Sequence, residues 1–295
     1  LVRRAGGLEA TVSGRLFDLA ALAAGGDGEA DPPPVAGTLR LDRLRLTPDI
    51  LMTGVEGALS RAADGARGAT LTGRLGAAQV RVEAAAPAAG GPARVRLVAD
   101  DAGGLLRGAG FFADGLGGAL EANALVTLAP ALSVSGEVAI RDMRVADDPA
   151  LRALLEKADA RPPDGADGVR FDLIRAPFRL GGARLSVAEA VAYGPTVGLS
   201  VTGDYDLGRD SLNMRGVFSP LFSVNAAVGR IPLLGDLLTG GEGRGLIAFN
   251  FTVSGPAGDP SVSVNPLSVL TPGVLRRLFE GGGDVVAPGD APPRG

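Results

Sequence analysis

The sequence contains no histidine, cysteine or tryptophan, and only one lysine among its 295 residues. Without histidine and cysteine the chain has no Ser-His-Asp triad, no thiolate nucleophile, no disulfide bond and none of the usual nitrogen or sulfur ligands for zinc, copper or iron. Carboxylates are the remaining route to catalysis, but the pairs Asp100-Asp101 and Asp147-Asp148 each precede a helical pattern, where capping explains them. We therefore expect a protein that is not an enzyme, with no catalytic residue, no metal and no cofactor.

Charge and long apolar runs are also scarce. The net charge is −4, the pI is about 5.1, and acidic and basic residues alternate along the chain, so no basic face for nucleic acid is indicated. The longest apolar tract, Val217–Leu238, is interrupted by Asn225, Arg230 and Asp236, which makes it unsuitable as a membrane-spanning helix of about 20 residues. Apolar residues still make up 46% of the chain, enough to form a core, although aromatics contribute only 4%.

The dominant pattern is an alternation of apolar and polar residues with a period of two. It is clearest in Leu132–Ile140 and in Thr196–Leu207, and it predicts strands with one apolar face. Glycine-rich turn signals stand between these runs, as at Gly181-Gly182 and Gly194-Pro195. The same alternation recurs in the segments around Leu39–Leu41, Val80–Val82, Val95–Leu97, Leu120–Leu128, Leu185–Val187, Ile247–Val253 and Val262–Val264. We predict a mainly β protein built as a long antiparallel meander.

Helical patterns are few. The clearest is Pro149–Ala158, which Asp148 caps, and weaker ones are expected at Asp101–Arg107, in parts of Ser219–Leu238 and at Pro272–Phe279. These are too few to cover both faces of a parallel sheet, which argues against a βαβ fold.

A sheet this long must bury its apolar face against something. Either it folds on itself as an ordinary sandwich, or it curls into a groove or half-barrel and leaves a trough. A trough lined by aliphatic side chains suits a hydrocarbon ligand, because burying acyl chains returns about 0.8 kcal/mol per methylene. Two long chains would then supply a gross term on the order of 20 kcal/mol before ordering costs. The alternation by itself does not choose between the trough and the sandwich.

The C-terminal half resembles the C-terminal region of AsmA-like envelope proteins. The resemblance is carried by Val169–Asp172, Phe178–Leu185, Ala192–Thr196 and Val201–Leu207, and upstream by Asp100–Arg107 and Gly117–Leu120. The later blocks Ile231–Gly241, Phe249–Pro256 and Asp259–Leu267 are similar to the terminal block of the YhdP-type members. The resemblance covers residues 95–280. Residues 1–94 are assigned only as an N-terminal part of the sheet, and residues 281–295 as a disordered tail.

This resemblance implies a piece of a bridge-like lipid transport protein of the Gram-negative cell envelope. Such proteins resemble one another in having an inner-membrane helix, which is absent from this chain, and a periplasmic β-sheet curled around a groove that carries phospholipid toward the outer membrane. The expected partners are phospholipid, a membrane at one or both ends and envelope proteins, with no nucleic acid. The alternative is a structural scaffold or assembly factor for the outer membrane that moves no lipid.

Candidate site residues follow from the strand patterns rather than from the family. The apolar alternates of the strongest strands are expected to line the groove: Val134, Val138, Ile140, Val197, Leu199, Val201, Ile247, Phe249, Phe251 and Val253. Arg276 and Arg277 end the last helical pattern, where they either favour the helix dipole or contact anionic head groups.

Overall fold

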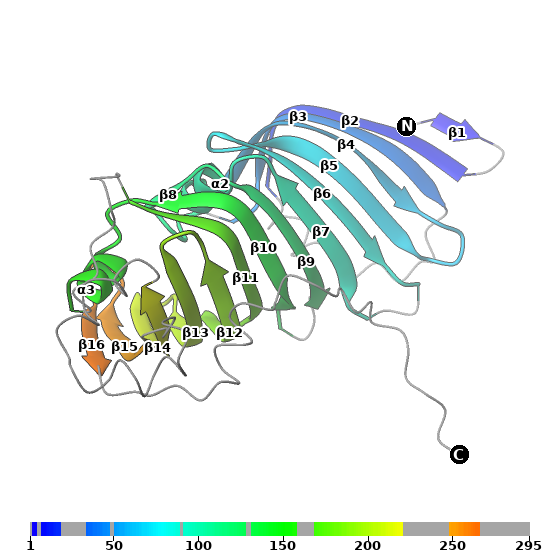
Figure 1. The fold of residues 1–295 in the computed structure, drawn as a ribbon. Helices are drawn as coiled ribbons and strands as arrows, with labels where there is room; N and C mark the ends of the chain where they lie inside the picture. The colour runs from blue at the N-terminus through cyan, green and yellow to red at the C-terminus, as the bar shows by residue number, and fades with distance from the viewer. Residues whose placement is uncertain are drawn as a thin grey trace, which may run out of the picture.

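The protein is described by a computed structural model that covers residues 2–4, 7–18, 34–47, 50–88, 91–127, 131–157, 168–220 and 248–265. These residues form one 16-stranded sheet and two short helices. The sheet stays open and does not close into a barrel (Figure 1). The expected mainly β fold, a long curled sheet with few helices, is therefore confirmed.

The strands are β1 (Val2–Arg4), β2 (Gly7–Asp18), β3 (Val35–Arg45), β4 (Leu51–Arg61), β5 (Arg67–Leu75), β6 (Ala78–Ala86), β7 (Ala93–Ala99), β8 (Gly115–Leu116), β9 (Ala119–Thr127), β10 (Ser133–Val145), β11 (Val169–Gly181), β12 (Arg184–Tyr193), β13 (Val197–Asp206), β14 (Ser211–Pro220), β15 (Phe249–Pro256) and β16 (Ser261–Asn265). The helices are α2 (Ala102–Gly108) and α3 (Pro149–Lys157).

The strands pair in nearly the same order as they follow in the sequence. The path runs from β1 to β16, with β8 placed off it against β10. Successive strands pair antiparallel except β2 and β3, which are parallel. The expected division of the chain falls between residues 94 and 95, and both residues lie inside β7. This strand pairs with β6 on one side and β9 on the other, so strand pairing continues through this point without a break.

The apolar alternation shifts at defined positions. In β10 both Ile140 and Met143 are buried, and Asp142 between them has a φ of 56°, although the register with β11 is the same on both sides of it. In β4 both Met52 and Val55 are buried, with Gly54 at a φ of 58° between them. A bulge such as the one at Gly54 bends a strand and increases its twist, which helps a long sheet to curl.

Both helices begin where the sequence predicts. Asp101 caps α2 by accepting a hydrogen bond at 2.9 Å from the Gly104 amide, and Asp148 caps α3 by accepting one at 2.7 Å from the Leu151 amide. Of the segment Ser219–Leu238, in parts of which a helix is expected, Ser219 and Pro220 end β14, because their backbone continues the ladder to β13. The rest of that segment and the helix expected at Pro272–Phe279 lie outside the described residues.

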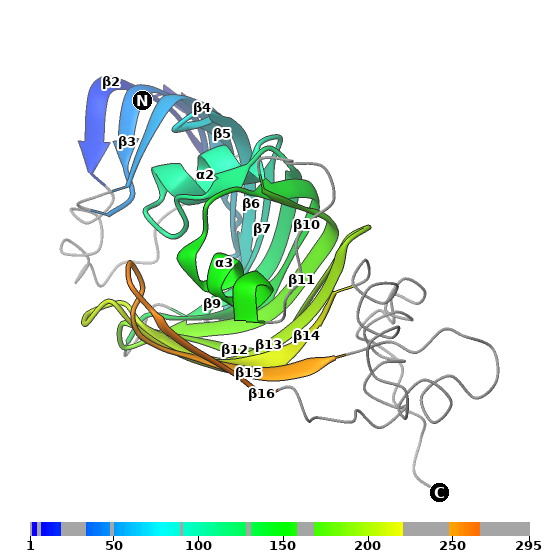
Figure 2. The same cartoon turned by 60° about the vertical axis from the view of Figure 1, so that its left-hand side comes forward.

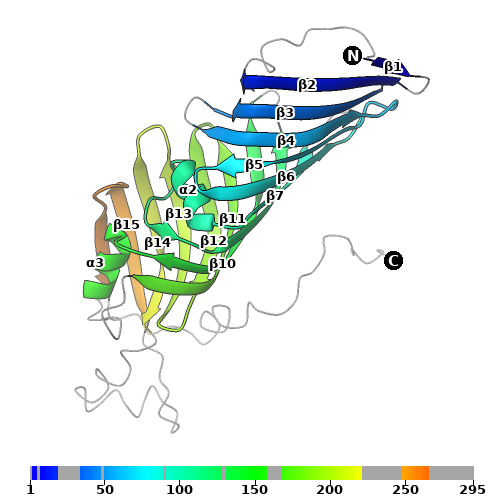
Figure 3. The ribbon, with the colours of Figure 1, turned by 90° about the horizontal axis from the view of Figure 1, so that it is seen from above.

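The two helices lie on the concave side of the sheet (Figure 2). Ala102 and Leu105 of α2 and Leu151 and Leu154 of α3 are buried in the same cluster as the apolar face of the strands. Seen from above, the strands turn direction between β2–β7 and β12–β14, as expected for an open twisted sheet (Figure 3). The core thus lies between the inner face of the sheet and the two helices.

Candidate functional site

The pairing registers divide the sheet into an inner and an outer face. Residues directly opposite each other in neighbouring strands point to the same side, so each register can be followed from strand to strand. We call the side that carries the core cluster the inner face. One inner-face register, named row A, contains only apolar residues and glycine: Ala10, Gly37, Leu59, Ala69, Ala84, Val95, Ala124, Gly136, Phe178, Val187, Gly203, Met214, Val253 and Val262.

Two further apolar registers run beside row A. Row B comprises Val12, Leu39, Gly57, Leu71, Val82, Leu97, Ala122, Val138 and Ala176, and resumes past a bulge with Ala190, Val201, Gly216, Phe251 and Val264. Row C comprises Gly73, Val80, Ala99, Leu120, Ile140, Ile174, Ala192, Leu199, Phe218 and Phe249. The inner face is therefore apolar over rows A and B from β3 to β16, and row C adds a third register from β5 to β15.

Burial differs across the width of this face. Most of row C is buried beside the helices; Val80, Leu120 and Ile140, for example, are each no more than 5% exposed. From β5 to β12 row A is only half-buried, and Leu59 in β4 is 42% exposed. The two helices therefore complete the core over row C and leave rows A and B accessible along the first part of the sheet.

A hollow of about 510 Å³ lies on the inner face over row A, from β3 to β7. Leu59, Ala69 and Ala84 of row A line it, together with residues of the next inner register: Val35, Arg61, Arg67, Ala86 and Ala93. With strands about 4.8 Å apart the hollow is about 19 Å long, longer than the about 15 Å hydrocarbon depth of one membrane leaflet. A larger hollow of about 990 Å³, from β4 to β10, belongs to the outer face, because outer-face residues such as Thr70, Glu83 and Arg96 line it.

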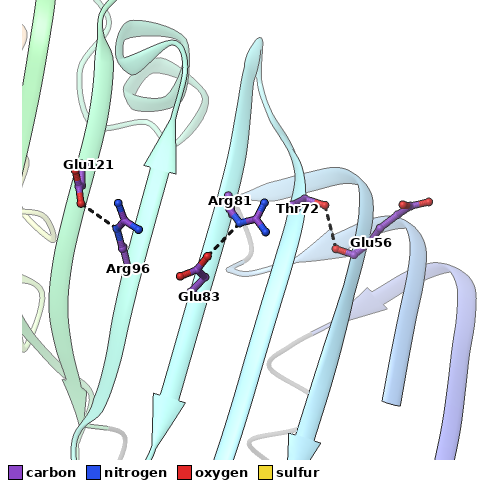
Figure 4. A network of polar contacts seen from close by, with 6 residues as sticks. All are labelled: Glu56, Thr72, Arg81, Glu83, Arg96 and Glu121. Atoms are coloured by element: carbon purple, nitrogen blue, oxygen red, sulfur yellow. Dashed lines mark hydrogen bonds and ion pairs between the residues drawn. The ribbon is translucent and has the colours of Figure 1, made fainter. Parts of the chain in front are cut away.

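The outer face is polar and solvated. Arg81 and Glu83 form an ion pair at 3.1 Å, and Arg96 and Glu121 form another at 2.9 Å (Figure 4). The hydrogen bond and charge of Arg96 lower the pKa of the Glu121 carboxyl. Ion pairs this exposed contribute little stability, about 0 to 1 kcal/mol each. They keep the outer face hydrophilic, so the hydrocarbon-compatible surface is confined to the inner face.

The structure separates the candidate groove residues into two groups. Val134, Val138, Leu199, Val201 and Phe249 are half-buried on the inner face. Ile140, Val197, Phe251 and Val253 are buried in the core cluster. Ile247, Arg276 and Arg277 lie outside the described residues.

The most accessible inner-face residues were missed by the sequence patterns. Leu59, Ala69 and Ala84 line the inner-face hollow, yet none of them belongs to the candidate set. Alanine and glycine contribute little to an apolar alternation, so a register built from them looks weak in the sequence. The usable signal was that charged residues were missing from every second position of these strands.

The carboxylates in the described strands and helices do not form a metal centre. Within the described ranges there is no group of three or more acidic residues that could hold a metal ion. Burial raises the pKa of Asp148, but this carboxyl caps α3 and accepts the Leu151 amide hydrogen. No helix in this part of the chain is both long enough and apolar enough to span a bilayer.

Comparisons with protein-family models, with curated proteins and with solved structures find no match to this chain. The functional argument therefore depends on the geometry of the inner face and on the residue patterns of the C-terminal half.

Proposed function

We propose that this protein binds the acyl chains of phospholipid in the hollow along row A and conducts lipid along the sheet. The observation that carries the proposal is the unbroken apolar register on a concave face, half-buried but not covered by α2 or α3 between β5 and β10. A hydrocarbon chain placed there would leave water without requiring any polar group to lose its partner.

Continuity of the register supports conduction as well as binding. An acyl chain that moves from one strand to the next along row A meets another apolar side chain or a glycine at each step. The cost of sliding is then much smaller than the about 0.8 kcal/mol per methylene needed to return the chain to water. Three parts of this proposal rest on the resemblance to AsmA-like proteins: transfer between the inner and outer membranes, a periplasmic location and an inner-membrane anchor upstream.

The test is photo-crosslinking at neighbouring positions that face opposite sides of β6. A photoreactive amino acid replaces Ala84 in row A in one sample and Glu83 on the outer face in the other, and each protein is mixed with phospholipid vesicles that carry an alkyne-tagged acyl chain. We expect lipid adducts at position 84 and none above background at position 83. Equal labelling at both positions, or none at either in folded protein, would reject the groove.

The alternative function, a scaffold that supports the outer membrane without moving lipid, makes the opposite prediction at the same positions. Under that reading gently purified protein carries no stoichiometric phospholipid by native mass spectrometry. A vesicle-to-vesicle transfer assay with a fluorescent phospholipid then separates the two readings, because a scaffold leaves the rate at its protein-free value.

A further inference from the structure

Two arginines lie directly opposite each other at one end of the hollow. Arg61 is the last residue of β4 and Arg67 the first of β5, and they form the final pair before the turn. That turn is held by the Ala62 amide donating to the Ala66 carbonyl at 2.8 Å. Arg61 lies two residues beyond Leu59, and Arg67 two residues before Ala69, so both belong to the inner face.

This placement is unusual within the sheet. From β3 to β16, the paired registers place no other charged residue on the inner face of the described strands. Like charges directly opposite each other in an antiparallel pair are destabilising. Two guanidinium groups that line one end of an otherwise apolar hollow offer several N–H donors to an anion.

The pair is continuous with the apolar surface. The inner-face hollow of about 510 Å³ is lined by Arg61 and Arg67 and also by Leu59, Ala69 and Ala84 of row A. An amphiphile can therefore have its polar end at the arginines and its apolar part along row A. Guanidinium groups suit phosphate in particular, since their fork of N–H donors matches two phosphate oxygens at once.

We infer that Arg61 and Arg67 bind the phosphate of a lipid head group, with the acyl chains extending from this hairpin along row A. This inference rests on the proposed function and adds to it the polarity of the bound lipid and a preference for head groups of net negative charge. A zwitterionic head group also has a phosphate, but its ammonium group is repelled by the second arginine. The preferred ligand is then an anionic phospholipid.

The experiment compares the binding of phosphatidylglycerol and phosphatidylcholine, both as fluorescent short-chain monomers, to three forms of the full chain. The variant Arg61→Gln/Arg67→Gln removes both charges. The matched control Arg40→Gln/Arg81→Gln removes two arginines from the outer face, where they pair with Glu56 and Glu83. We expect wild type and control to bind phosphatidylglycerol about tenfold more tightly than phosphatidylcholine, and the inner-face variant to bind both alike.

The possible failures are distinguishable. If wild type binds neither lipid, the proposed function itself is wrong. If it binds both equally and Arg61→Gln/Arg67→Gln changes nothing, acyl binding stands and the head-group site is rejected. A parallel sample with inorganic phosphate identifies the source of the anion: competition at millimolar phosphate would reject a site for lipid head groups and indicate one for free phosphate. Thermal unfolding of each variant, followed by circular dichroism, confirms that the sheet is folded.

Discussion

Val95 and Val98 lie on the same strand, β7, and face opposite sides of the sheet. Val95 is directly opposite Ala84 and Ala124 in row A, whereas Val98 is directly opposite Arg81 and Glu121 on the outer face. Both are valines, and Val98 is 37% exposed. The pair therefore allows one chemical change to be made on each face of a single strand.

The first prediction uses this pair. Val95→Asp places a charge in row A, where an acyl chain lying along the row would have to desolvate it, so we expect loss of phospholipid binding. Val98→Asp adds the same charge among polar neighbours and should leave binding unchanged. Lipid content of the purified proteins, measured by mass spectrometry after solvent extraction, checks both. Equal lipid content in the two folded variants would contradict a groove on the inner face.

The second prediction concerns Gly136, which lies in row A between Ala124 and Phe178. A Cβ atom added there would lie 2.8 Å from the Ala124 Cα and 2.9 Å from its Cβ, so the strands would have to move apart. We expect Gly136→Ala to lower the free energy of unfolding by about 1 to 3 kcal/mol. At Gly14 an added Cβ meets only the Leu41 Cδ2 atom, at 3.7 Å. Gly14→Ala should therefore be neutral or stabilising by up to about 1 kcal/mol. Urea unfolding of both variants is the measurement, and similar losses at the two sites would refute the close-approach argument.

The third prediction is a pH dependence that originates at Asp148. Burial raises the pKa of this carboxyl above its ordinary value of 3.8, so the folded protein keeps the proton to a higher pH than the unfolded chain does. Stability from this group is present below pH 3.8 and is lost as the pH rises through the folded pKa. Asp148→Asn keeps an N-cap side chain without the titration. As the pH rises from below the folded pKa of Asp148 toward neutrality, the variant should gain stability relative to wild type. Urea unfolding at several pH values measures the difference in the free energy of unfolding. A difference that does not vary with pH would contradict the prediction.

The fourth prediction concerns the outer ion pair of Arg96 and Glu121. The lowered pKa of Glu121 means that its contribution is present above the ordinary value of 4.5 and is lost as the pH falls through the folded pKa. A double-mutant cycle with Arg96→Gln and Glu121→Gln should give a coupling of less than about 1 kcal/mol, reduced further by salt. Phospholipid binding should be the same in all four proteins. A coupling of several kcal/mol would show that this face is less solvated than its exposure indicates.

Much of the local structure could be predicted from the residues alone. The alternation in Leu132–Ile140 corresponds to the first part of β10, and Asp101 and Asp148 cap the helices that follow them. These features depend on neighbours within a few positions, because side chains alternate across a strand and an N-cap bonds an amide two or three residues ahead. The bulge at Gly54 was not predictable, since the choice of the skipped residue depends on the partner strand.

The candidate site was predicted only in part, for a related reason. Ile140 in row C and Val95 in row A have the same apolar character, yet Ile140 is buried in the core and Val95 is only half-buried. The sequence by itself determined that a long sheet would have one apolar and one polar face, because that follows from a period of two. Only the tertiary structure decided which part of the apolar face stays accessible, since that depends on how far twist and bulges curl the sheet and on which registers α2 and α3 cover.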